Sequence, residues 1–281
     1  MKQKITSSLI SLTLLITILT ALTTPVNSQT TKIIWSDELQ LLYDPSVTVW
    51  DPELKKNVTV TIPDWDGLPA ITPTSDGKLW ITWQTDATGN DDIFYKYYTH
   101  ATSTWSQDNQ LTTDPQTDFG PTITQTADNK IWIFWSSNKI GNNEIYYKTT
   151  TDNGANWSTE TTLTTDPKED DNPSAFQTKD GRLWVVWTRM INSTNYDLYY
   201  KTFSGGSWSS ETQLTTHVKR EQTPAITQTA DNKIWVFWSS DKTAPYWQIF
   251  YKTSTTNGAS WSSDTQLTTE ARDSVDPTVF Q

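Results

Sequence analysis

The sequence predicts an all-β fold, a β-propeller of four-stranded antiparallel blades, each about 52 residues long, and three observations support this prediction. First, a segment with two tryptophans three residues apart recurs at spacings of 52, 52 and 51 residues, as in repeat architectures. Its leading tryptophans are Trp80, Trp132, Trp184 and Trp235. Second, these segments are apolar at odd and even positions alike, so a strand formed by them needs cover on both faces. Third, each period holds four strand-like segments and no helical periodicity, which is typical of propeller blades.

Residues 1–28 have the features of a secretory leader. Lys2 and Lys4 precede an apolar run that ends at Leu22, and Val26-Asn27-Ser28 places modest side chains where a signal peptidase cleaves. The mature chain is therefore predicted to begin at Gln29 and to be secreted or held at the cell surface. An uncleaved membrane anchor is the alternative, although the run is short for a spanning helix. No later segment is predicted to enter a membrane.

Residues 29–66 combine a partial blade with an insertion. The segment 35–41 matches the fourth-strand segment 105–111, so the chain is predicted to begin on an outer strand. These two segments lie further apart than one period, which indicates an insertion between 45 and 66. Trp50 and Trp65 of the insertion belong to no repeat, so the propeller proper is predicted to span residues 67–281.

From residue 67 onward the order of segments is constant. An extended segment opens with a proline, and the five prolines are Pro69, Pro121, Pro173, Pro224 and Pro277. An Asp-Gly or Asp-Asn turn leads to the tryptophan-rich strand, because these pairs accept the positive φ of tight hairpins. A polar loop, a third strand and a Gly/Asn/Thr turn follow. Fourth strands begin at Trp105, Trp157, Trp208 and Trp261.

The repeat count predicts four complete blades with partial ones at both ends, because the last segment, 276–281, is again a first strand. We therefore expect a fragment of a propeller or an open array of blades. A two-sheet sandwich is the alternative fold, but it does not account for a repeat of constant length and content.

The turn from Thr150 to Trp157 resembles the Asp-box, Ser/Thr-x-Asp-x-Gly-x-x-Trp, of sialidase-like (BNR-repeat) β-propellers. Its motif residues are Asp152, Gly154 and Trp157. The copy with Gly258 and Trp261 matches except that Thr256 replaces the aspartate. The resemblance implies a structural role on the face opposite the active site. The aspartate accepts backbone N–H bonds, the glycine supplies a positive φ and the tryptophan packs beneath the turn.

Sialidases of this kind use an arginine triad for the substrate carboxylate, a Tyr/Glu nucleophile pair and an aspartate acid/base. The resemblance thus implies a sialidase-like glycoside hydrolase as one function. In that family, the first arginine of the triad normally lies in an Arg-Ile-Pro motif in the first blade. This sequence departs from that pattern, because its first arginine is Arg182 and no Arg-Ile-Pro is present.

The connectors after the fourth strands are acidic. Their carboxylates are Asp114 and Asp118, then Asp166, Asp170 and Asp171, then Glu270, Asp273 and Asp276. Such groups could bind Ca²⁺ or act as acid and base, but they could equally be solvated loops that cap strand ends. No EF-hand or other metal-loop spacing is present, so no metal or cofactor is predicted. Asp92, Glu144 and Asp197 recur before the third strands and are expected to be structural.

Departures from the repeat indicate a candidate ligand site. Arg189 stands where sister repeats have Thr or Ser, and His217 replaces a connector acid. The candidate ligand-binding residues are Arg189, His217, Lys219, Arg220, Tyr246, Trp247 and Arg272. Guanidinium groups hold a carboxylate bidentately and aromatic rings stack on a pyranose, so the set predicts a site for an acidic sugar. The alternative is that these arginines pair with neighbouring acids.

Composition narrows the partners. The net charge of -11 argues against nucleic acid and anionic lipid, and the absence of cysteine requires a fold that is stable without disulfides. Asn57-Val-Thr, Asn156-Trp-Ser and Asn192-Ser-Thr match the N-glycosylation pattern, but chance matches are expected in a chain rich in Asn, Ser and Thr. Glycosylation and oligomeric state stay open.

The sequence thus predicts an exported propeller that binds a glycan or another surface ligand. A glycoside hydrolase with part of its active site missing is one alternative, and a structural repeat module of a larger surface protein is the other.

Overall fold

The computed structural model describes residues 46–51, 56–61 and 67–279, and the chain divides into two units, residues 1–64 and 65–281. In the first unit, β1 (Ser46–Asp51) and β2 (Lys56–Thr61) form an antiparallel hairpin with Ser46 opposite Thr61. This hairpin lies within the predicted insertion. The predicted leader and the segment 35–41 lie outside the described residues, so both stay predictions.

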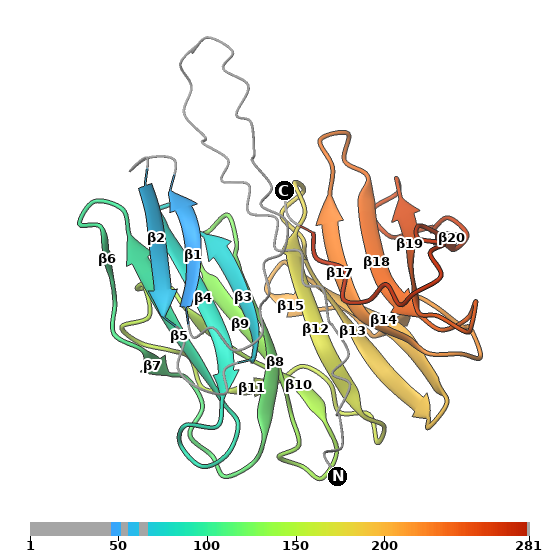
Figure 1. The fold of residues 1–281 in the computed structure, drawn as a ribbon, viewed down its shortest axis with the longest axis horizontal. Coiled ribbons are helices and arrows are strands. Elements are labelled where there is room, and N and C mark those ends of the chain that lie inside the picture. The colour runs from blue at the N-terminus through green and yellow to red at the C-terminus, as the bar shows by residue number, and fades with distance from the viewer. Residues whose placement is uncertain (1–45, 52–55, 62–66, 280–281) are drawn as a thin grey trace, which may run out of the picture. The chain divides into compact units, whose positions relative to one another are not determined.

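In the second unit, residues 67–279 form four antiparallel sheets that follow one another along the chain, coloured from cyan to red in Figure 1. Blade 1 is β3 (Gly67–Pro73), β4 (Lys78–Thr85), β5 (Asp92–Thr99), β6 (Thr104–Trp105) and β7 (Asn109–Gln110). Blade 2 is β8 (Asp118–Gln125), β9 (Ile131–Ser137), β10 (Glu144–Thr150) and β11 (Thr161–Thr162). Blade 3 is β12 (Asp170–Gln177), β13 (Leu183–Asn192), β14 (Asn195–Ser204), β15 (Ser207–Trp208) and β16 (Thr212–Gln213). Blade 4 is β17 (Glu221–Gln228), β18 (Ile234–Ser240), β19 (Gln248–Ser254) and β20 (Thr265–Gln266). The predicted propeller with four complete blades is confirmed.

The first strand of each blade begins two or three residues before the proline that was expected to open it. Each proline lies in a β-bulge, as the register of β8 shows, where pairing skips from Phe119 to Thr122. The residue before the proline has a φ between 49° and 59° in all four blades. Proline cannot donate to the ladder, so the bulge places it where no donor is needed.

These bulges also join neighbouring blades. The N–H of Gly120 donates to Gln84 Oε1 at 2.9 Å, that of Asn172 to Ser136 Oγ at 3.1 Å, and that of Thr223 to Thr188 Oγ1 at 3.2 Å. In each case the acceptor belongs to the second strand of the preceding blade. The N–H of Asp276 donates to Ser239 Oγ in the same way. Residues 274–279 therefore follow the path of a further first strand, although no strand forms there.

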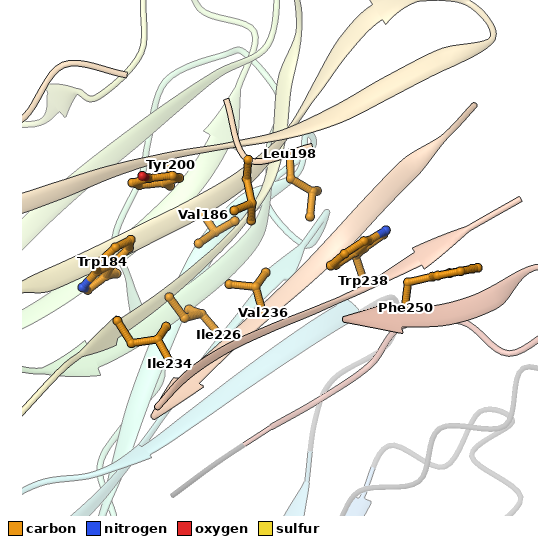
Figure 2. Packing of buried hydrophobic residues seen from close by; sticks show 10 residues of the cluster. Trp184, Val186, Leu198, Tyr200, Ile226, Ile234, Val236, Trp238 and Phe250 are labelled. Atoms are coloured by element: carbon orange, nitrogen blue, oxygen red, sulfur yellow. The ribbon is translucent and has the colours of Figure 1, made fainter. Parts of the chain in front are cut away.

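The hydrophobic core lies between blades. Ile131, Ile133 and Trp135 of β9 pack against blade 1, whereas Trp132 and Phe134 pack against blade 3. Both faces of the tryptophan-rich strand are therefore buried, as the sequence predicts. Figure 2 shows the seam between blades 3 and 4. There, residues of β13 and β14 lie opposite residues of β17, β18 and β19: Trp184, Val186, Leu198 and Tyr200 on one side, and Ile226, Ile234, Val236, Trp238 and Phe250 on the other.

The Asp-box of blade 2 is attached to blade 1. Asp152 accepts hydrogen bonds from Thr150 Oγ1, from the Asn156 N–H and from Asn156 Nδ2, and these bonds lower its pKa to about 2. Gly154 has a φ of 81° and leaves no room for a Cβ, which would approach Trp80 of blade 1 to 2.9 Å. Trp157 Nε1 donates to Tyr95 Oη of blade 1 at 3.0 Å.

The degenerate box of blade 4 keeps this geometry without the aspartate. The Ser260 N–H donates to Thr256 Oγ1 at 2.9 Å, so the threonine hydroxyl replaces the missing carboxylate. Gly258 lies against Trp184 of blade 3, and Trp261 packs edge-on to the same ring at 6.1 Å. The Asp-box turns thus join successive blades on one face of the propeller.

Candidate functional site

The opposite face carries the loops between second and third strands and the connectors between blades, and we call it the connector face. Amide side chains join each loop to a connector. Asn90 Nδ2 donates to the carbonyls of Asp114 and Gln116, and Asn142 Nδ2 donates to those of Asp166 and Lys168. Gln248 Nε2 does the same for Glu270 and Arg272 in blade 4. In blade 3 the loop shortens to Ser193 and Thr194.

His217 occupies a turn position that an aspartate holds in the sister connectors. Asp114 Oδ1 accepts the Gln116 N–H, and Asp166 Oδ1 accepts the Lys168 N–H. His217 Nδ1 accepts the Lys219 N–H at 3.2 Å. The exchange of Asp for His thus keeps the turn and places an imidazole and the exposed Lys219 on the connector face.

Arg189 lies in the seam between blades 2 and 3 and is only 3% exposed. Its Nε and Nη2 donate to both oxygens of Asp170 at 2.6 Å, and its Nη1 lies 2.9 Å from Glu211 and 3.3 Å from Asp166. The guanidinium carbon lies 4.4 Å from the centre of the Tyr199 ring. The guanidinium is thus surrounded by three carboxylates and an aromatic ring of its own chain.

The other seams hold lysines in the same role. Lys139 lies 2.7 Å from Asp114 and 2.6 Å from Glu160, and Lys242 lies 2.8 Å from Glu221. Each lysine comes two positions later in its repeat than Arg189 does. The guanidinium of Arg189, which belongs to strand β13, therefore occupies the place that the ammonium groups of Lys139 and Lys242 reach from loops. Sequence reasoning could find this only by comparing positions two residues apart.

Buried acids complete these seams. Burial raises the pKa of Glu144 to about 7 and that of Asp197 to about 6, although hydrogen bonds from Thr164 and Gln213 oppose the shift. Asp118, which accepts from Trp135 Nε1 at 3.1 Å, has its pKa raised to about 6 for the same reason. These carboxylates are buried inside the fold, where burial disfavours their charged form and hydrogen bonds from their own chain stabilise it.

Asp171 is a connector acid without an acidic counterpart in the neighbouring blades. It is half-buried, and its Oδ1, like Asp118 Oδ2, is buried without a hydrogen-bond partner among the described residues. Burial, followed by the nearby Glu169, raises its pKa to about 7. The corresponding residues before the bulges of blades 2 and 4 are Phe119 and Gln222, so this carboxylate is a departure from the repeat. The grouping of Asp171 with Asp166 and Asp170 in the sequence hides this difference.

Arg220 is the arginine whose guanidinium has no carboxylate partner among the described residues. Its guanidinium lies over the Tyr196 ring, 5.8 Å from the ring centre, and Nη2 donates to the Ser193 carbonyl at 3.4 Å. Within the described part of the chain it has no ion-pair partner. The other three arginines each have one, since Arg182 pairs with Asp180 and Arg272 with Glu270.

Loop 241–247 of blade 4 joins the connectors that carry the remaining candidates. At its start, Asp241 Oδ1 accepts the backbone N–H of Arg220 at 2.9 Å. At its end, the N–H of Trp247 donates to Asp273 Oδ1 at 2.8 Å. Tyr246 in this loop is 39% exposed and Trp247 is half-buried. The loop thus contacts the two connectors that carry His217, Lys219, Arg220 and Arg272, although the Arg220 guanidinium itself lies against Tyr196 and Ser193 of blade 3. Arg189 lies apart in its seam. We call His217, Lys219, Arg220, Tyr246, Trp247 and Arg272 the blade 4 cluster.

Two features are absent from the described residues. No group of three or more His, Cys, Asp or Glu side chains could hold a metal ion there. No helix among them is long and apolar enough to cross a membrane.

No protein-family model matches the chain, and no curated protein matches it. Solved structures do. The GH93 α-L-arabinofuranosidase of Fusarium graminearum with arabinobiose superposes with a TM-score of 0.61 at 15% identity, covering 80% of this chain and 71% of that one. The intramolecular trans-sialidase from Ruminococcus gnavus superposes with a TM-score of 0.59 at 11% identity, covering 73% and 71%.

The Hadza microbial sialidase Hz136 gives a TM-score of 0.55 at 12% identity, and the chain spans only 50% of its length. These similarities show that the chain has the sialidase-like β-propeller fold.

Proposed function

We propose that this chain is an exported or cell-surface propeller that recognises glycans, and that the blade 4 cluster binds an acidic sugar. The observation that carries the proposal is Arg220, which has no ion-pair partner among the described residues of a chain with a net charge of -11. A guanidinium surrounded by excess acid normally acquires a carboxylate partner. This one is instead held over Tyr196 on the connector face, available to a carboxylate of a ligand.

The rest of the cluster supplies what a sugar ring requires. Tyr246 and Trp247 offer aromatic surface for the apolar face of a pyranose, with polar edges for its hydroxyl groups. Lys219 and Arg272 are exposed and add positive charge. The likeness to arabinofuranosidase and sialidase structures supports a carbohydrate over other anionic ligands.

Arg189 is not a ligand contact in this proposal, because three carboxylates of the chain already bond its guanidinium. The blade 4 cluster therefore depends on Arg220 for the carboxylate. A hydrogen bond to a charged group contributes about 1.5–3 kcal/mol, which corresponds to roughly tenfold to hundredfold in affinity.

The test begins with a glycan array probed with the wild-type chain, followed by titration of an acidic-glycan hit against Arg220→Ala. We expect a loss of about tenfold to hundredfold for that variant. Arg182→Ala is the matched control, since Arg182 lies on the Asp-box face, where it donates to the Asn257 carbonyl. Equal losses in both variants, or no binding to acidic glycans, would refute the proposal and leave a structural repeat module.

Asp171 favours hydrolysis as a second candidate function. A carboxyl group with a pKa near 7 and an unpartnered oxygen can protonate a leaving group at neutral pH. The sialidase pattern of an Arg-Ile-Pro motif in the first blade is missing, so an arabinoside is tested beside a sialoside. Release of the chromophore from an aryl glycoside that is lost in Asp171→Asn would support this function. No turnover of either substrate would exclude it.

Export is tested on the same preparations. The charged start, apolar run and Val26-Asn27-Ser28 place the expected cleavage before Gln29. The N-terminal sequence of material recovered from the medium should begin there. A chain that keeps Met1 and fractionates with membranes would contradict it.

A further inference from the structure

We propose that Asn192, at the tip of the hairpin between β13 and β14, is a site of N-linked glycosylation. The proposal rests on the export part of the proposed function, because the modification takes place on the secretory route. It does not depend on ligand binding by the blade 4 cluster.

The local geometry favours modification at Asn192. The hairpin has a two-residue loop, and Asn192, Ser193 and Thr194 are all exposed. Asn192 Oδ1 accepts hydrogen bonds from the N–H and from the hydroxyl of Thr194, both at 3.0 Å. The hydroxyl that the acceptor pattern requires therefore already contacts the carboxamide of its asparagine. Within the described structure, Asn192 Nδ2 donates to no group and stays free to react.

Asn156 has the opposite geometry. Its Nδ2 donates to Asp152 Oδ2 at 2.7 Å, and its N–H donates to Asp152 Oδ1. The hydroxyl of Ser158 does not contact Asn156, because it donates to the Thr159 carbonyl and accepts the Thr149 N–H. A sugar on Asn156 would disrupt the Asp-box that joins blades 1 and 2. This site is therefore expected to stay unmodified.

The third match, Asn57, lies inside the ladder of β2, opposite Trp50. Its acceptor residue Thr59 pairs with Thr48 in the same ladder. At Asn192 a tight turn brings the hydroxyl of Thr194 onto the Asn192 carboxamide. Residues 57–59 are instead extended and paired with β1, so their backbone does not form such a turn. Asn192 and Asn156 both lie in exposed loops, and of these two only Asn192 has a carboxamide nitrogen that donates to no described group.

The reaction uses a lipid-pyrophosphate-linked oligosaccharide as the sugar donor. Asn192 Nδ2 attacks the anomeric carbon of the donor, and a C–N bond forms as the bond from that carbon to the pyrophosphate oxygen breaks. The amide nitrogen loses one proton to a base of the transferase, and the lipid pyrophosphate leaves with the bonding electrons. No oxidant or reductant is required.

The position has a consequence for the connector face. Arg220 Nη2 donates to the carbonyl of Ser193, the middle residue of this site. A glycan on Asn192 therefore extends from the loop that helps to position Arg220.

The experiment uses the full chain secreted into the medium by a host with an N-glycosylation pathway. Trypsin cuts after Arg189 and Lys201, so peptide 190–201 reports on Asn192 and peptide 149–168 on Asn156. We expect glycan on the first peptide and none on the second. Asn192→Gln and Thr194→Ala should remove it, whereas Ser193→Ala and Thr194→Ser should keep it.

A secreted chain with unmodified Asn192, or with glycan on Asn156 instead, would overturn the proposal and leave export intact. A chain that never reaches the medium would overturn export together with it. Because the control variants change the same two-residue loop, a loss of glycan in Ser193→Ala would assign the effect to the hairpin's structure and would also contradict the proposal.

Discussion

Replacing Arg189 with alanine should destabilise the propeller by about 3–5 kcal/mol, the range measured when one partner of a buried ion pair is removed. The substitution removes both bonds to Asp170, which is fully buried, and the contacts with Glu211 and Asp166. Asp170 and Asp166 then lose their cation in the seam between blades 2 and 3, whereas Glu211 keeps Lys201 at 3.4 Å. Glu144, whose pKa is already raised to about 7 by burial, lies close enough to Asp170 and Arg189 to feel their charges.

The size of the effect depends on which of the three carboxylates can be solvated by water once the guanidinium is removed. Glu211 and Asp166 are partly exposed, with 26% and 30% of their side chains accessible, so water can solvate them. Asp170 has no such access, and its desolvation penalty stays unopposed. It must either take up a proton or draw water into the seam. The loss therefore arises mainly at Asp170.

Thermal and urea unfolding of the two chains measure the difference. A loss of 3–5 kcal/mol corresponds to a fall in Tm of roughly 6–20 °C for a unit of this size. Arg189→Ala with Asp170→Asn should recover part of the loss, because the buried charge is removed as well. A loss below about 1 kcal/mol for Arg189→Ala, the range of exposed ion pairs, would refute this account.

A second double variant should also recover stability, because it imitates the serine and lysine of the neighbouring blades. Arg189→Ser combined with Ile191→Lys places serine and lysine at the spacing of Ser137 and Lys139 in blade 2. The new ammonium should reach Asp166, Asp170 and Glu211 as Lys139 reaches Asp114, Asp118 and Glu160. If this double variant loses as much stability as Arg189→Ala, the lysine arrangement of blade 2 cannot replace the arginine arrangement of blade 3.

Two further predictions concern the whole propeller. Glu144, Asp171, Asp118 and Asp197 have pKa values raised to between about 6 and about 7, so their contribution to stability is complete below the ordinary carboxyl pKa and is lost as the pH rises through the folded values. The chain should therefore melt higher at pH 5 than at pH 8, and Glu144→Gln should flatten this dependence; a Tm that rises between pH 5 and pH 8 would contradict it. Gly258→Ala should destabilise the fold more than Gly181→Ala. The two glycines have φ values of 82° and 83°, but a Cβ at 258 would meet Trp184 at 2.3 Å and one at 181 meets nothing within 4 Å. Gly181→Ala is expected to cost about 1–2 kcal/mol from backbone strain alone, and equal costs would show that Trp184 moves aside freely.

The fold was readable from the sequence because its determinants are local. Trp132 and Phe134 alternate with Ile133 and Trp135, and this alternation repeats at a nearly fixed interval. Two apolar faces on every copy require a neighbour on each side, and only stacked blades provide that for all copies. The starts of the first strands could not be read in this way. Proline usually opens a strand, and only the bulge at Asn172 and its equivalents allows it inside one.

For the candidate site, the sequence identified the unusual residues, and the tertiary structure decided which of them are engaged within the fold. Departures from the repeat identified Arg189 and Arg220 alike, because both are arginines where sister copies have other residues. Only the tertiary structure separates them. Asp170 and Glu211 are 19 and 22 residues from Arg189, and they meet it through strand pairing and a blade seam. Arg220 contacts no such acid in the described part of the chain, and its guanidinium lies over Tyr196 instead. Burial and charge pairing depend on residues that are brought together from distant positions, and a local pattern does not contain that information.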